Sequence, residues 1–116
     1  MKSKEFFIWC GEKGLISNKI IAESFNVSAQ TVRNWKKKED LPLWVSFACL
    51  ALENNYTADD FSFSDFKSWQ KRNNIITYEE TGNAFGIKRQ AIHQWFRRGR
   101  FPKWISLACF GYNLKH

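Results

Sequence analysis

The sequence predicts an all-α protein of about eight helices, arranged as two copies of one four-helix unit. An internal repeat, helix start and stop signals at matched positions in both copies, and weak strand patterning throughout predict this fold. Of the 116 residues, 44% are hydrophobic, six are Trp and eleven are Phe. Large rings allow even a short unit to bury a substantial core.

The repeat appears when the chain is shifted by 60 residues, without a gap. Matched positions are mainly apolar and mismatched ones mainly polar, as expected for two copies of one packing scheme with different surfaces. The most distinctive identical pairs are Trp9 and Trp69, Trp35 and Trp95, Trp44 and Trp104, and Pro42 and Pro102. All six tryptophans pair across the repeat at positions that face inward, whereas platforms that stack on unpaired bases must be exposed. We therefore expect all six to lie in the core.

Each copy begins with a helix, expected over residues 4–13 and 64–72. Gly14 in the first copy, and Asn73 with Asn74 in the second, tolerate left-handed backbone and end that helix. The second helix follows an N-cap, Ser17 or Thr77. Glu80 lies three residues after Thr77, which predicts a capping box.

The third helix is expected over residues 29–37 and 89–97. The fourth begins at Pro42 and at Pro102, because proline fits the first turn of a helix. A polar, turn-rich stretch follows the first copy. We therefore divide the chain into a first unit over residues 1–53, a linker over residues 54–63 and a second, basic unit over residues 64–116.

The second and third helices of each copy must cross closely at a tight turn. A small residue, Ala22 or Gly82, is available at the crossing, and Asn26 or Gly86 tolerates the positive φ of the turn. Residues 86–104 (GIKRQAIHQWFRRGRFPKW) and, more loosely, residues 26–35 (NVSAQTVRNW) resemble the phage Cro/CI-like, or XRE-type, helix-turn-helix family.

This resemblance implies two tandem four-helix helix-turn-helix units of the lambda-repressor-like kind. It implies a sequence-specific regulator of transcription, a repressor of phage or mobile-element type, that binds double-stranded DNA. The third helix of each unit would enter the major groove, where Arg reads guanine and Gln or Asn reads adenine. The outward residues of these helices are Ser28, Gln30, Thr31, Arg33 and Asn34 in the first copy, and Lys88, Arg89, Gln90, His93 and Gln94 in the second.

Basic residues follow both third helices and are expected beside the sugar-phosphate backbone. They are Lys36, Lys37 and Lys38 in the first copy, and Arg97, Arg98 and Arg100 in the second. The helix N-termini at Ser17 and Thr77 offer N–H groups to a further phosphate.

Charge is divided unequally between the copies. The chain has a net charge of +7, which suggests a polyanionic partner. Residues 1–60 hold eight Lys and Arg against eight Asp and Glu, whereas residues 61–116 hold ten against three. The second unit is therefore expected to supply most of the affinity for DNA. The first unit would read a second half-site or contact a protein partner.

Several classes of protein do not fit the sequence. Three cysteines without CxxC spacing and two histidines argue against a zinc site or a disulfide framework, and we expect no cofactor. No catalytic triad, carboxylate pair or phosphate-binding loop is evident, so no enzymatic activity is expected. With neither a signal-peptide core nor a membrane-spanning stretch, we expect no membrane partner and a cytoplasmic location, in a bacterial nucleoid or a phage-infected cytosol.

The sequence leaves several alternatives open. The chain could bind RNA, or act as an adaptor or antitoxin-like inhibitor on the same scaffold. Homodimerisation would bring four units together. The half-sites of a DNA target would be inverted if a pseudo-two-fold relates the units, and direct if a translation does. An extended linker would be long enough for either arrangement.

Overall fold

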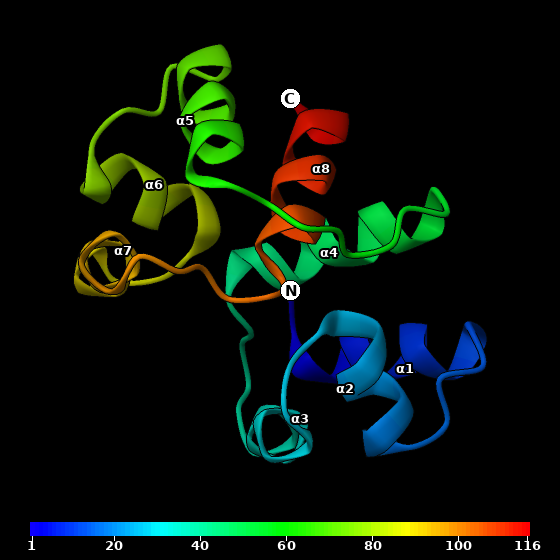
Figure 1. The fold of residues 1–116 in the computed structure, drawn as a ribbon. Coiled ribbons are helices and arrows are strands. Elements are labelled where there is room, and N and C mark those ends of the chain that lie inside the picture. Colours follow the sequence, from blue (N-terminus) through cyan, green and yellow to red (C-terminus); the bar gives the residue numbers. More distant parts are fainter.

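The computed structural model describes all 116 residues and confirms an all-α fold of eight helices (Figure 1). The first repeat contains α1 (Ser3–Glu12), α2 (Asn18–Phe25), α3 (Ala29–Lys36) and α4 (Leu43–Glu53). The second contains α5 (Phe63–Arg72), α6 (Tyr78–Phe85), α7 (Arg89–Arg98) and α8 (Ile105–Lys115). None of these helices has the length and apolar character needed to cross a bilayer.

The expected caps of α2 and α6 are confirmed. The Ser17 hydroxyl accepts the backbone N–H of Ile20. At α6, the Thr77 hydroxyl accepts the N–H of Glu80, and the Glu80 carboxylate accepts the N–H of Thr77, so the capping box is complete. Gly14 and Asn74, which end the first helix of each repeat, have φ of 76° and 55°.

The start of the last helix was predicted correctly in one repeat only. Pro42 is the N-cap of α4, one residue from its expected place. In the second repeat the helix begins at Ile105, three residues after Pro102, so that prediction was wrong. The connector is held differently there, because the ring of Phe101 lies 4.4 Å from that of Phe63 and 4.8 Å from that of Phe66.

The segment between the repeats is packed against the protein rather than extended. The N–H of Asp59 donates to the Ser106 hydroxyl at 3.0 Å, and the Tyr56 ring stacks on Phe110 at 4.1 Å. Helix α5 begins at Phe63, inside the expected linker, because Ser62 and Asp65 form a capping box.

The two repeats share one hydrophobic core, in which α4 packs along α8 at the centre of the molecule (Figure 1). The most prominent contact is a stack of Trp44 on Trp104, with ring centroids 4.0 Å apart and planes inclined by 5°. All six tryptophans belong to the core or pack against it, although Trp9, Trp95 and Trp104 are only partly buried.

Candidate nucleic-acid interface

A tight left-handed turn joins the second and third helices of each repeat. Asn26 has φ of 56° and Gly86 has φ of 69°, as their positions in the sequence predicted. The N–H of Ile87 donates to the Gly82 carbonyl at 2.9 Å. A Cβ on Gly82 would lie 2.6 Å from the carbonyl oxygen of Ile87, so the close crossing of α6 and α7 requires glycine. Gly82 therefore allows the short distance between α6 and α7 and so determines where α7 lies on the surface.

The α7 face consists of Lys88, Arg89, Gln90, His93 and Gln94, on the side of the helix opposite the buried Ile92. All five side chains are exposed except Gln94, which is half-buried. None of them forms an ion pair, because both ion pairs of the chain belong to Lys2. The positive charge of this face is therefore not neutralised within the protein.

The α3 face consists of Ser28, Gln30, Thr31, Arg33 and Asn34, and its polar groups bind one another. The Ser28 hydroxyl caps α3 by accepting the N–H of Thr31 at 3.0 Å. The Gln30 side-chain oxygen accepts from Arg33 at 2.9 Å, and its amide donates to Asn34 at 3.0 Å. The side chain of Gln30 is thus held by Arg33 and Asn34, whereas the side chain of Gln90 has no such hydrogen bonds.

The N-termini of α2 and α6 offer different environments to an anion. At α6, Thr77 is occupied by its capping box, and the hydrogen bonds from the Thr77 backbone N–H and hydroxyl hold the pKa of Glu80 below its usual value. Glu79 adds a second carboxylate there. A phosphate at Thr77 would meet both charges. The first turn of α2, after Ser17, has no carboxylate and contains Lys19. The N–H groups at the start of α2 are therefore better suited to an anion than those at the start of α6.

The connector after α3 is held against the N-terminus of the chain. Lys2 forms ion pairs with Asp40 at 2.9 Å and Glu39 at 3.6 Å, and a hydrogen bond and the charge of Asp40 raise the pKa of Lys2. Lys36 lies over the Phe7 ring, 5.4 Å from its centroid. Together with the exposed Lys37 and Lys38, it forms a basic edge beside two paired carboxylates.

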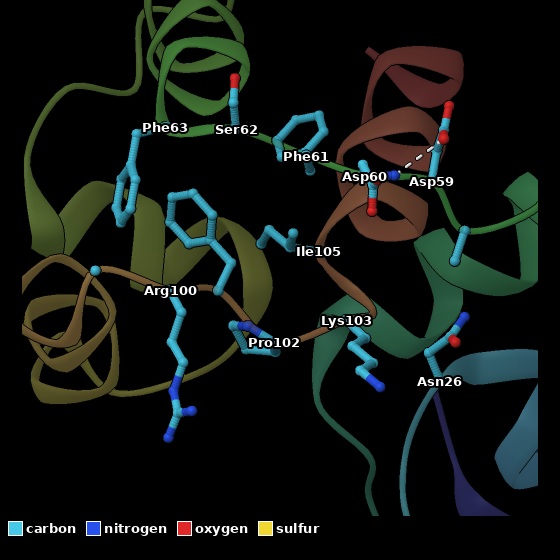
Figure 2. A pocket seen from close by; sticks show the side chains of 13 residues that line it. Asn26, Asp59, Asp60, Phe61, Ser62, Phe63, Arg100, Pro102, Lys103 and Ile105 are labelled. Atoms are coloured by element: carbon cyan, nitrogen blue, oxygen red, sulfur yellow. Dashed lines mark hydrogen bonds between the residues drawn. The ribbon is translucent and has the colours of Figure 1, made fainter.

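The connector after α7 has no acidic residues. Gly99 and Arg100 stand where the first repeat has Glu39 and Asp40, and the helix runs two positions further, with Arg97 and Arg98 exposed at its end. Figure 2 shows the Arg100 side chain extending away from Asp59 on the neighbouring linker. These three arginines therefore add to the unneutralised charge of the α7 face.

A hollow of about 560 Å³ lies between the start of α6 and the α7 face. Four of the expected DNA-binding residues meet there: Thr77, Arg89, Gln90 and His93. Tyr78 packs beside His93, with ring centroids 5.6 Å apart, and Glu79 contributes the one carboxylate. The structure thus brings residues from the start of α6 and from α7 to one surface.

No family model matches this chain, and no curated protein or solved structure matches it either.

Two further basic residues lie beside the α3 face and were not predicted from the sequence. Lys19 of the first repeat and Lys103 of the second line one hollow of about 470 Å³, together with Ser28 at the start of α3 (Figure 2 shows Lys103 beside Asn26). Lys103 thus adds charge to the face of the other repeat. The helix N-terminus at Ser17 was a sufficient signal for Lys19. No local pattern reveals the position of Lys103, because it depends on how the repeats pack.

Proposed function

We propose that this protein is a sequence-specific regulator that binds double-stranded DNA through two helix-turn-helix units, α2–α3 and α6–α7. The observation that carries the proposal is the α7 face, a row of mostly exposed basic and amide side chains that form no ion pair, with Arg97, Arg98 and Arg100 beside it. A protein surface that keeps so many cations unneutralised is suited to a polyanion. The tight turns at Asn26 and Gly86 present each third helix on the surface.

The mechanism follows from the chemistry of the two faces. Arg89 and Gln90 at the start of α7 can make two-point hydrogen bonds to guanine and adenine in the major groove. Arg97, Arg98 and Arg100 would contact phosphates beside it, which supply affinity but no sequence information. Occupancy of such a site would repress transcription by excluding RNA polymerase, in keeping with a phage or mobile-element regulator.

The proposal is tested by the salt dependence of duplex binding. Each phosphate contact contributes about 0.9 to the slope of log K against log salt. We expect Arg97→Ala with Arg98→Ala to lower the slope by about 1.8 and to weaken binding about tenfold at moderate salt. Lys36→Ala with Lys37→Ala should have a smaller effect, because Lys36 already packs on Phe7.

A charge-matched control distinguishes direct phosphate contacts from a general effect of the protein's positive charge. Lys67 and Lys71 are exposed on α5, in the same repeat, and neither lines the hollow at the α7 face or the hollow that holds Lys103. Replacing both with Ala removes the same charge and should leave the slope nearly unchanged. Equal losses from all three pairs would contradict the proposed interface, and so would the absence of duplex binding at low salt.

A second candidate function, contact with a protein partner, is favoured by the surface of the first repeat. Ile8 and Ile20 are 56% and 38% exposed, whereas the second repeat has Ser68 and Glu80 at these positions. Contiguous exposed apolar surface marks protein contacts, and the second repeat exposes apolar residues at other positions, Tyr78 by 39% and Leu114 by 47%. If this candidate is correct, Ile8→Ser with Ile20→Glu will abolish binding of the protein partner and leave DNA binding intact.

A further inference from the structure

The contacts between the two repeats are reciprocal. Trp44 and Trp104 occupy equivalent positions and stack on each other. A Cβ on Gly86 would lie 2.6 Å from the backbone nitrogen of Leu43, and the equivalent residues, Asn26 and Lys103, line two hollows together. If residue i of one copy meets residue j of the other, and j meets i in return, the copies are related by a two-fold axis and not by a translation.

A chain of four tryptophans connects α3 to α7 through this pseudo-two-fold axis. Trp35 lies 5.7 Å from Trp44, Trp44 lies 4.0 Å from Trp104, and Trp104 lies 5.6 Å from Trp95. The first and last steps are equivalent contacts inside the two repeats, and the middle step joins equivalent residues of the two repeats. Because these are stacked and edge-on contacts inside a packed core, they hold α3 and α7 in one fixed relation.

Helices α3 and α7 therefore flank the axis as a symmetric pair. Figure 1 shows both helices nearly end-on, and the connectors that follow them converge on the N-terminal ends of α4 and α8. The Cα body measures 36 Å in its longest direction. That length limits the distance between the two helices to about one turn of B-DNA, which is 34–36 Å.

The side chains on the two faces break this symmetry. The second repeat carries the whole net charge, and Gln90 is untied whereas Gln30 is bound by Arg33 and Asn34. Lys88 and Arg89 stand where the first repeat has Ser28 and Ala29. Equivalent positions would thus present different donors and acceptors to the base pairs.

We propose that a single chain acts as its own dimer and binds one inverted pair of unlike half-sites. This inference rests on the proposed function and adds the orientation of the two half-sites, their inequality and the stoichiometry of the complex. No second copy is needed to create the two-fold axis, because α4 and α8 already form that contact within the chain. The half-site centres lie no more than about one helical turn apart.

The test alters the DNA rather than the protein, so folding of the chain is not at issue. Bound sequences are selected from random duplexes with the full-length protein, and the selected site is rebuilt in two forms. One form turns the weaker half-site around at constant spacing, which makes a direct repeat. The other replaces the weaker half-site with an inverted copy of the stronger one, which makes a perfect palindrome. Light scattering gives the mass of each complex.

We expect an inverted, asymmetric site bound by one chain. The direct repeat should bind roughly 10²- to 10⁴-fold more weakly, because one of the two linked contacts is lost. The palindrome should also bind more weakly than the selected site. Selection of direct repeats, or two chains on one site, would overturn the inference while the proposed function stands. If no sequence is enriched, the proposed function fails and the inference falls with it.

Discussion

Replacing Gly111 with Ala is expected to separate the two repeats. Gly111 lies in α8, where it crosses α4, and an added Cβ would overlap the carbonyl oxygen of Phe47. The obstructing atom is backbone in the middle of a helix, so no side chain can rotate to make room. The overlap can be relieved only if α4 and α8 move apart.

The size of the effect follows from what that movement disrupts. Separating the helices by about 1 Å forfeits a quarter to a half of each dispersion contact across the interface, including the stack of Trp44 on Trp104. Overpacking of this kind costs about 1–3 kcal/mol, and sometimes more. The better helix propensity of Ala returns up to about 1 kcal/mol. At the upper end of that cost we expect a net loss of about 2 kcal/mol and a fall in Tm of roughly 8 °C.

The assay is thermal unfolding followed by circular dichroism, with Gly11→Ala as the matched control. Gly11 is also helical, and an added Cβ would meet nothing within 4 Å. This control should gain up to about 1 kcal/mol, with a small rise in Tm. Equal Tm shifts in the two variants, or an unchanged Tm for Gly111→Ala, would refute the α4–α8 crossing described here.

Three further predictions concern the surface, the caps and the thiols. Lys103→Gln should lower the salt slope of DNA binding by about 0.9, whereas Lys115→Gln at the end of α8 should leave it unchanged. Glu80→Gln should lower stability at pH 7, whereas Glu79→Gln should have little effect. The pKa of Glu80 is depressed on folding, so its contribution is present above the unfolded value of about 4.3 and is lost as the pH falls further. Unfolding curves at pH 7 and pH 3 should therefore differ less for Glu80→Gln than for the parent protein. Burial raises the pKa of the Cys10 thiol to about 11 and raises those of the other two cysteines as well. A thiol-specific reagent at pH 8 should therefore label the folded protein slowly and all three thiols promptly after unfolding.

Features governed by local backbone chemistry could be predicted from the sequence. Ser17 and Thr77 were identifiable as caps because a hydroxyl at that position satisfies a free N–H group. Asn26 and Gly86 were identifiable as turn residues because few residue types accept a left-handed backbone. The exposure of the α7 face followed from the helical period once Ile92 was assigned to the core.

Features that depend on which surfaces meet could not be predicted. The pairing of α4 with α8 joins residues about 60 positions apart, and no periodic pattern in either helix specifies its partner. The same limit applies to Lys103, which lies beside α3 only because the repeats pack through a pseudo-two-fold axis. Pro102 shows that a local signal can fail, because α8 begins three residues after it, whereas α4 begins directly after Pro42.

Duplication within one chain allows equivalent positions to differ, which a homodimer forbids. Trp9 donates to Glu53 across the first repeat, whereas the buried Nε1 of Trp69 has no partner, since Asn113 bonds to Asn73 instead. The interior tolerates such differences, and the surface uses them to concentrate charge on one repeat. That repeat would then be steered to the phosphates first, and salt would govern this step. Binding of that repeat would hold the α3 face near the DNA at a high effective concentration, so that Gln30, although bonded to Arg33 and Asn34, would suffice to read the second half-site.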